Sequence, residues 1–576
     1  MRARSGPMFP HPHAMAQSRS PILLALLVLV AVAVVAGRAR AQALTDEERA
    51  AVRAIVEAHA DADTPGFTWA LWRDGAIVSS GARGMADLER RVPLSVDSRL
   101  RIASTSKQFT AASILALVED GALDLETPVH ELVEELHPFD PPVRLRHLVA
   151  HQSGLPDYLF LMDLKGYPPA LPYSFDEALG VLARLRTTTF EPGTDYAYSN
   201  TNYLLMAEIV RRTSGSTLRA FAHERLFAPL GMERTHFSDD RDELVPDRAL
   251  GYERGPDGAW RLSLTPLELV GDGGVFTTVG DLFRWTQELR LGRAERVGVL
   301  SADGVRRQLK PFTLGEGRGD YAFGLLIERV ADGTLVSHGG AFVGYRADCL
   351  HCPEAGWGVA VLFNRADGRP TQVGIDLLNA IGIDTQLVPD PVARRDPFDT
   401  DVEVAKLPEW ARALRGMATL ADGTPVRVGV VGEFLRLQGP SVDLQLAAPN
   451  ADATRLVNRD SSVTLASTEL GLVLDLGDDR LLRLERYASA PPGKDGFGTF
   501  AGSWRVRELD ARWEFVRRDS RREVYDVLDA RGSRGRVTPL GPDLARGPMA
   551  SIVWHDGEQW RLWASELGVL HLDRVE

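Results

Sequence analysis

Hydrophobic positions between residues 43 and 385 follow two different periods, which predicts a mixture of helices and strands. The segment "TDEERAAVRAIVEAHA" spaces its apolar residues three and four apart, as one face of a helix does. The segment after it, "FTWALWRDGAIVSSGARG", reads as two strands joined by a turn at Asp74-Gly75. Longer apolar-periodic stretches then alternate with loops as far as about residue 290.

Strand patterns return near the end of this region. Two strands are expected from about Leu335 to residue 352 and over 357–363, followed by a closing helix over 372–382. Because strands stand at both ends and helices between them, we expect one sheet that the two ends build together. The region 43–385 is therefore predicted to be one mixed α and β domain.

The pattern changes after a proline-rich stretch. Residues 386–402 include "LVPDPVARRDPFDT" and are predicted to be a linker. The chain beyond it consists of short alternating segments such as "PVRVGVVGEFLRLQG" and "RWEFVRR", which predict small antiparallel barrels or sandwiches. The stretch "ASAPPGKDG" divides this all-β region, so we expect one β module over 403–487 and a second over 497–576.

Composition places the chain among soluble globular proteins. It has 576 residues, too many for one core, with 44% hydrophobic and 25% charged residues. The formal net charge of -13 argues against nucleic acid as a partner, because phosphate binding needs a basic surface. Lysine is rare: it occurs only at 107, 165, 310, 406 and 494, so a motif that contains lysine is less often a chance match.

The N-terminus is predicted to be a secretory signal peptide over residues 1–41. Residues 22–36 are wholly apolar but too few to span a bilayer, which takes roughly 20 residues. The sequence "ARAQ" at 39–42 supplies a cleavage site, so the mature chain should begin near Gln42 and be exported, periplasmic or secreted, without a stable membrane span. An uncleaved anchor is the alternative.

The two cysteines stand close together in "CLHC", as Cys349 and Cys352. Their flanks indicate a strand, on which residues three apart face opposite sides, so a disulfide is disfavoured. The segment offers too few ligands for a structural zinc site. Buried free cysteines are the first interpretation, and a disulfide or a redox or metal role are the alternatives.

Candidate chemistry begins with "RIASTSKQFT", where Ser104 and Lys107 form the only S-x-x-K of the chain. A helix is expected from about Ser104 to Asp120, which puts both side chains on one face, one turn apart. A buried lysine loses part of its preference for the charged form and can take a serine proton. The alternative is that Ser104 or Ser106 only caps the helix.

Two further motifs hold polar side chains beside glycines or a helix start. In "YAYSNTNY", Tyr198 could relay a proton and Asn200 could orient a carbonyl, or the pair could be a core aromatic and a helix cap. In "SHGGAF", His338 could bind a carboxylate or shift protons near pH 7, and Gly340 would let a substrate approach the strand. The alternative there is a surface turn.

The order of these three motifs resembles the β-lactamase-related serine hydrolases: class C β-lactamases, DD-carboxypeptidase-type penicillin-binding proteins, D-aminopeptidases and esterases. Further segments, from about 65 to 385, resemble family signatures in family order: "GMADLERRVPLSVDSRLRIASTSKQFTA", "VRLRHLVAHQSGLPDY", "ERLFAPLGMERTHF", "GDGGVFTTVGDLFRW" and "GWGVAVLFNRADG". The resemblance implies a β-lactamase/transpeptidase-like fold of class α+β (α/β), with an antiparallel sheet flanked by helices and a helical region.

The resemblance also implies roles for the motif residues. Ser104 would be the acylated nucleophile and Lys107 its base, Tyr198 would share proton transfer and protonate the leaving group, and Asn200 would hold the substrate amide. His338 would stand where β-lactamases have the lysine of Lys-Thr-Gly. The backbone N–H groups of Ser104 and Ala341 would form the oxyanion hole, beside Gly340.

Histidine in place of that lysine resembles the D-aminopeptidase and esterase branch, as do the added β modules. We therefore expect an exported serine hydrolase that cleaves a small ester or peptide amide and needs no metal or cofactor. The alternatives are a non-catalytic receptor or pseudoenzyme for peptidoglycan fragments and a class C-like β-lactamase. Asp157 and Tyr158 are expected to border the substrate pocket. The oligomeric state cannot be read from the sequence.

Overall fold

The computed structural model describes residues 43–388, apart from 166, 168–170, 291–297, 315–316 and 319–320; beyond residue 415 it describes strands alone. The predicted signal peptide and all but the first three residues of the predicted linker lie outside the described residues. No helix in the described part of the chain is long and apolar enough to cross a membrane.

The main sheet is built by both ends of the first region, as the strand pattern predicted. Its strands run in the order β12-β13-β15-β16-β1-β2, and β14 pairs with β15. The N-terminal strand β1 pairs antiparallel with β16, with Phe67 opposite Phe363 and Trp72 opposite Gly358. The strands span Phe67–Arg73 (β1), Ala76–Arg83 (β2), Leu326–Val330 (β12), Gly333–Ser337 (β13), Gly340–Phe342 (β14), Tyr345–His351 (β15) and Gly358–Phe363 (β16).

The hairpin between β1 and β2 turns where the sequence predicted. Asp74 and Gly75 have φ angles of 52° and 72°. Two successive positive φ values give the turn whose twist matches that of paired strands, and Asp-Gly is among the pairs that adopt it readily. The turn thereby sets the register of the N-terminal edge of the sheet.

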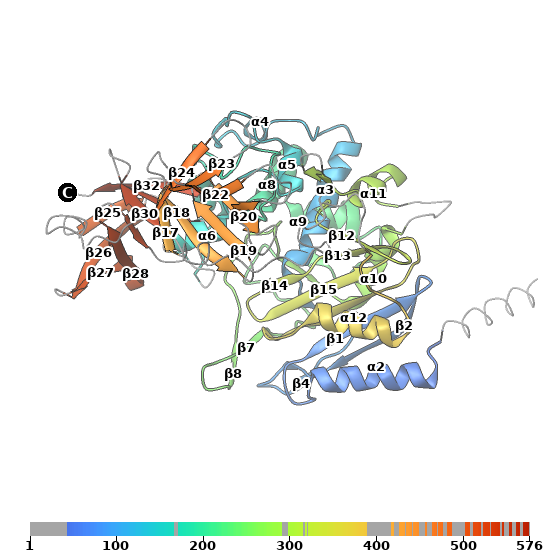
Figure 1. Cartoon of the computed structure of the whole chain (residues 1–576). Coiled ribbons are helices and arrows are strands. Elements are labelled where there is room, and N and C mark those ends of the chain that lie inside the picture. The colour runs from blue at the N-terminus through green and yellow to red at the C-terminus, as the bar shows by residue number, and fades with distance from the viewer. Residues whose placement is uncertain are drawn as a thin grey trace, which may run out of the picture.

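Helices cover both faces of this sheet (Figure 1). The helices α2 (Asp46–His59) and α12 (Pro370–Ala380) share one apolar cluster with β1, β15 and β16. Thr45 begins α2 with a capping box, in which its hydroxyl accepts from the Glu48 N–H and the Glu48 carboxylate accepts from the Thr45 N–H. The other face meets α10 (Val279–Glu288) and the helical region.

The helical region is organised around α3 (Lys107–Glu119), which is buried from Lys107 to Leu117. It packs against α8 (Asn200–Ser214) in the larger apolar cluster. The remaining helices of this region are α4 (Val129–Leu132), α5 (Leu145–Val149), α6 (Tyr158–Lys165), α7 (Phe175–Leu182), α9 (Leu218–Ala222), the π-helix η2 (His223–Phe227) and α11 (Ala302–Gln308). A helix buried on all sides explains why no polar stripe marks residues 107–117 in the sequence.

Short strand pairs complete the described fold. A small sheet joins β5 (Leu100–Arg101), β9 (Val275–Thr277) and β6 (His236–Phe237) directly before the Ser104 segment. The other pairs are β3 (Met85–Asp87) with β4 (Val92–Pro93), β7 (Tyr252–Arg254) with β8 (Trp260–Leu262), and β10 (Thr313–Leu314) with β11 (Gly317–Arg318).

The C-terminal strands form two closed barrels, β17–β24 and β25–β32, in the orange and red part of Figure 1. The first comprises Gly416–Thr419, Pro425–Val431, Phe434–Gly439, Val442–Ala447, Arg455–Val457, Thr464–Thr468, Gly471–Asp475 and Leu481–Arg486. The second comprises Gly502–Val506, Ala511–Asp519, Arg522–Asp529, Gly532–Gly541, Leu544–Arg546, Ile552–His555, Trp560–Ala564 and Gly568–Arg574. The limits 403–487 and 497–576 proposed for the β modules stay predictions.

Candidate active site

Ser104 lies on a tight turn rather than on the first turn of an α-helix. A 3₁₀ turn, η1 (Ala103–Ser106), precedes α3, so the expected helix from Ser104 begins three residues later. Ala103 has a φ of 46°, which an alanine adopts only under constraint from its surroundings. The Ile102 N–H donates to Val275 O at 3.0 Å, which ties the start of this turn to β9. Tertiary contacts thus override the local helix preference at Ser104.

The capping alternative for the serines is not observed. Neither η1 nor α3 has a side-chain cap, and the Ser106 hydroxyl accepts from the Val275 N–H instead. The Thr105 hydroxyl donates to His338 O at 2.8 Å, joining the Ser104 turn to the end of β13. Ser104 is left with its hydroxyl directed toward Lys107.

Lys107 lies fully buried at the start of α3 and contacts three oxygen atoms. Its Nζ lies 3.1 Å from Ser104 Oγ, 2.7 Å from Asn200 Oδ1 and 2.6 Å from Asp272 O. Of the three, Asn200 Oδ1 and the Asp272 carbonyl can only accept hydrogen bonds. As an ammonium, Lys107 has one proton for each of the three oxygens and donates to Ser104 Oγ as well. As an amine, it would keep two protons for the two obligate acceptors and direct its lone pair at the Ser104 hydroxyl.

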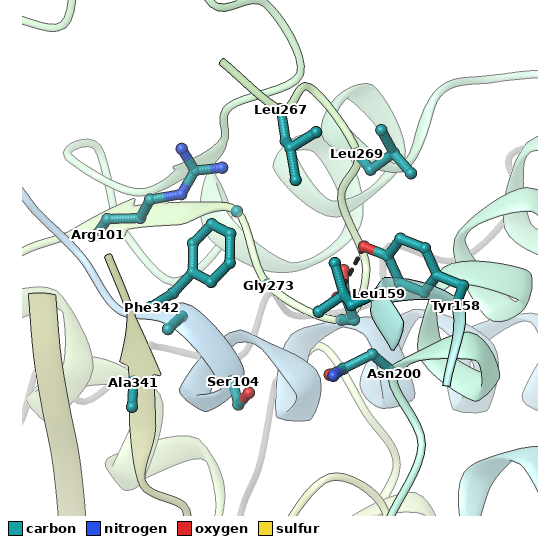
Figure 2. A pocket seen from close by; sticks show the side chains of 13 residues that line it. Arg101, Ser104, Tyr158, Leu159, Asn200, Leu267, Leu269, Gly273, Ala341 and Phe342 are labelled. Atoms are coloured by element: carbon teal, nitrogen blue, oxygen red, sulfur yellow. Dashed lines mark hydrogen bonds between the residues drawn. The ribbon is translucent and has the colours of Figure 1, made fainter. Parts of the chain in front are cut away.

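The orientation of Asn200 is fixed from behind by Asp157. Asp157 Oδ2 accepts from both the backbone N–H and the side-chain Nδ2 of Asn200, each at 2.8 Å. The Asn200 carbonyl oxygen must therefore face Lys107. The neighbouring Tyr158 hydroxyl donates to Asp272 Oδ2 at 3.1 Å (Figure 2). Burial raises the pKa of Asp157 and of Asp272, although the hydrogen bonds to Asp157 act in the opposite direction.

Tyr198 covers the open side of this arrangement. The residue is 40% exposed, and the Lys107 Nζ lies 4.9 Å from the centre of its ring. Asn200 opens α8 two residues later without capping it, since Ser199 is the N-cap and makes no side-chain bond. The structure thus brings Ser104, Lys107, Tyr198 and Asn200 together, while the proton-transfer role of Tyr198 stays a prediction.

His338 is buried between β13 and β14 and is not a surface residue. Burial, and secondarily the charge of Lys107, lower the pKa of His338 to about 3. The ring is then neutral near pH 7, which disfavours proton exchange by His338 there, and the role of His338 in the reaction stays a prediction. Its Nδ1 lies 2.7 Å from Gly339 O and its Nε2 lies 3.1 Å from the hydroxyl of Tyr321.

A buried chain of hydrogen bonds runs from His151 through Tyr321 to His338. The Nδ1 of His151 accepts from the Ser199 N–H at 3.2 Å and faces the Asn202 amide at 3.0 Å. Its proton must therefore be on Nε2, which donates to the Tyr321 hydroxyl at 3.2 Å. The hydroxyl in turn donates to His338 Nε2, so His338 holds its own proton on Nδ1. Burial lowers the pKa of His151 as well, so the neutral form of both histidines is favoured along this series of hydrogen bonds.

A pocket with a volume of about 70 Å³ opens beside Ser104 (Figure 2). The predicted oxyanion residue Ala341 lies in its wall, and Gly340 packs behind the Ser104 turn. Tyr158 lines the pocket as expected, whereas Asp157 acts from behind Asn200. The lining residues are Arg101, Ala103, Ser104, Tyr158, Leu159, Asn200, Leu267, Leu269, Asp272, Gly273, Gly274, Ala341 and Phe342.

Sequence reasoning missed four residues of this site: Arg101, His151, Asp272 and Tyr321. His151 stands in "HQSGLPDY" and Asp272 in "GDGGVFTT", both quoted for family resemblance without a role. Tyr321 follows His151 by 170 positions, and no local pattern marks it. Only the packing of α8 and the β13–β14 connection against these segments brings them together.

The two cysteines lie outside the pocket beside Ser104. Cys349 and Cys352 are free and buried, in two different apolar clusters, which confirms the first interpretation. Within residues that the structure describes, no group of three or more His, Cys, Asp or Glu side chains could hold a metal ion.

The family described as "Beta-lactamase" matches residues 51–381, more than half of the chain. The chain therefore belongs to the β-lactamase family, among the β-lactamase-related serine hydrolases. Within it, the chain is similar to a D-aminopeptidase of Cereibacter sphaeroides, with 30% identity over 83% of this chain and 87% of the relative. A D-aminopeptidase of Brucella anthropi is 33% identical over 56% of this chain. The matched part spans only 61% of that relative's length.

Two solved structures share the fold. The octameric penicillin-binding protein homologue from Pyrococcus abyssi has a TM-score of 0.51 and 22% identity, over 85% of this chain and 99% of its own. SurE has a TM-score of 0.52 and 23% identity, over 76% of this chain and 98% of its own. At this level of identity the likeness concerns the fold alone.

Proposed function

We propose that the protein is a serine hydrolase that works through an acyl-enzyme on Ser104 and acts as a D-aminopeptidase on small peptides or amides. The observation that carries the proposal is the contact set of Lys107. Two of its three neighbours can only accept, so a Lys107 that has given up its extra proton would present its lone pair to the Ser104 hydroxyl. The relatives named D-aminopeptidase support the substrate class.

Acylation would begin with Ser104 Oγ attacking the substrate carbonyl carbon while its proton passes to Lys107 Nζ. The resulting oxyanion would be held by the backbone N–H groups of Ser104 and Ala341, each worth about 3 kcal/mol of transition-state stabilisation. Tyr198, whose ring lies over the Lys107 Nζ, would pass that proton to the leaving amine. The C–N bond then breaks, and the acyl group stays on Ser104.

Deacylation would repeat these steps with water as the nucleophile. Lys107 and Tyr198 would take the proton of the attacking water and return it to Ser104 Oγ as the ester bond breaks. The acid product and the free enzyme result, and no cofactor is consumed. Ser104 and Lys107 are the groups without which neither half-reaction proceeds.

The test is acid-quenched mass spectrometry of residues 42–576 after exposure to p-nitrophenyl acetate, with Ser104→Ala as the control. We expect an acetyl group on the Ser104 peptide that is absent from the variant. The matched pair D-alanine p-nitroanilide and L-alanine p-nitroanilide then tests the substrate class, with cleavage of the D-form at least about tenfold faster. A folded protein that forms no adduct and releases no p-nitrophenol would contradict the enzyme and favour a receptor for peptidoglycan fragments.

We also propose that the protein is exported, on the strength of the apolar run at 22–36 and the cleavage signal at 39–42. Fractionation of cells that express the full chain should place the protein outside the cytoplasm, with an N-terminus near Gln42 by mass spectrometry. An intact N-terminus in the membrane fraction would favour the uncleaved anchor instead.

A further inference from the structure

Arg101 places a guanidinium in the wall of the pocket that contains Ser104. It lies on β5, three residues before Ser104, and only 8% of the residue is exposed. The backbone pairing of Arg101 with Phe276 in β9 fixes its position. Figure 2 shows its side chain on the side of the pocket where Phe342 and Leu267 also lie, away from Asn200.

The guanidinium has no counter-ion among the residues that the structure describes. Its Nε is buried without a hydrogen-bond partner, and its guanidinium carbon lies 5.8 Å from the centre of the Phe276 ring. The Tyr345 and Asp272 side chains interact with it electrostatically without forming an ion pair. Arg211 and Arg212, by contrast, both bind the Glu208 carboxylate, whereas the neighbouring Arg248 resembles Arg101 in having a buried Nε without a partner. An arginine keeps its charge even when buried, so an unpaired one leaves a large desolvation cost uncompensated.

The charged groups around Arg101 do not supply that compensation. Arg248 lies over the same Phe276 ring, at 5.2 Å, and adds a second positive charge. The carboxylate of Asp272 attracts Arg101 from within the pocket wall but is held by the Tyr158 hydroxyl. The apolar side chains Leu267 and Phe342 exclude water from part of the surroundings, which strengthens the attraction for an anion.

The pocket takes one particular half of the substrate. In the proposed mechanism the leaving group departs toward Tyr198, and neither Tyr198 nor His338 lines this pocket. The acyl half therefore occupies it, extending from Ser104 toward Arg101. Among the residues that line this pocket, Arg101 is the only arginine, lysine or histidine.

We infer that Arg101 binds a carboxylate on the acyl half of the substrate, so that the preferred substrates carry an acidic side chain there. This rests on the proposed function and specifies its substrate class. Guanidinium and carboxylate match as a planar, two-point hydrogen-bonded pair, which a lysine cannot reproduce. For an aminopeptidase, the substrate would begin with an acidic D-residue.

The test compares hydrolysis of two esters that differ only in charge. The mono-p-nitrophenyl ester of adipic acid carries a carboxylate, and the p-nitrophenyl ester of adipic acid monoamide carries an uncharged amide of the same shape. We expect kcat/KM to favour the carboxylate by about 30-fold or more in the unaltered protein, and Arg101→Gln to remove that preference. Arg101→Lys should give an intermediate ratio.

Arg248→Gln is the matched control, because it removes a neighbouring arginine over the same ring that does not line the pocket. It should keep the preference for the carboxylate, and a ratio measured within each variant does not depend on how much protein folds. A preference for the amide, or the same ratio in Arg101→Gln as in the unaltered protein, would overturn the inference. Failure of Ser104 to acetylate with p-nitrophenyl acetate would instead overturn the proposed function, and the inference with it.

Discussion

Tyr321 is the residue on which the two buried histidines of the site depend. Its hydroxyl accepts from His151 Nε2 and donates to His338 Nε2, at 3.2 and 3.1 Å. Tyr321→Phe would leave both imidazole nitrogens buried without a partner, at a cost of about 1–3 kcal/mol for each. Because His338 stands at the end of β13 beside the Ser104 turn, we expect kcat to fall about tenfold with a smaller change in KM.

Tyr252→Phe is the comparison for that prediction. Tyr252 is also buried, but its hydroxyl accepts from the Leu88 N–H at 2.9 Å, outside the chain that joins His151, Tyr321 and His338. It should lower the melting temperature while kcat stays within about twofold. Steady-state kinetics of both variants test this prediction. An unchanged kcat in Tyr321→Phe would show that the hydrogen bonds from His151 through Tyr321 do not position His338.

At the scale of elements, strand β14 and the Ser104 turn approach more closely than a side chain allows. A Cβ on Gly340 would lie 2.0 Å from Ile102 O and 2.8 Å from Thr105 Oγ1. Gly340→Ala should therefore push β14 and its Ala341 N–H away from Ser104, and a displacement near 1 Å costs about 100-fold in rate. The measurement is the rate of p-nitrophenyl acetate hydrolysis.

The adjacent Gly339 provides the control for this element. A Cβ there would meet only Asp348 Oδ2, at 3.9 Å, which is ordinary contact. Gly339→Ala should keep most of the activity, within about threefold, although it alters the same His-Gly-Gly motif. Equal losses in the two variants would mean that the motif needs flexibility rather than close approach.

At the scale of the whole molecule, buried histidines make the fold sensitive to acid. Burial lowers the pKa of His147 to about 4 and of His351 and His338 to about 3, from an ordinary value of 6.5, and lowers that of His151 as well. The unfolded chain binds these protons first, so the free energy of unfolding falls as the pH drops below 6.5. Burial raises the pKa of Asp348 to about 6 and also raises the pKa of Asp157 and Asp272, and these three carboxyl groups oppose the effect in part.

His351 allows this pH dependence to be measured at one position. Both of its ring nitrogens are buried without a partner, so replacing it should cost little at pH 7. His351→Leu should lose less stability between pH 6.5 and 4.5 than the unaltered protein, by up to about 2–3 kcal/mol. Urea unfolding at the two pH values is the measurement. The exposed His223→Gln is the control, and an unchanged slope in His351→Leu would contradict the assignment.

Local patterns determined the elements that need no distant partner. The Asp74-Gly75 turn, the capped helix α2 and the strand β16 were all predictable, because a short stretch of chain carries both their period and their boundary signals. The single strand expected from about Leu335 to residue 352 was wrong, since this stretch forms β13, β14 and β15, with breaks at His338-Gly339 and Val343-Gly344. Ser104 and Lys107 met as expected because three residues of any helical turn place them on one face. The order of the motifs also identified the family.

Tertiary structure decided how that pair is completed. The acceptors of Lys107 come from positions 93 and 165 residues further on, and Tyr321 meets His151 across 170 residues. Arg101 is a pocket residue only because β5 pairs with β9. Such contacts depend on how buried helices and strand ends pack. The spacing of hydrophobic residues along the chain does not predict which distant polar groups that packing brings together.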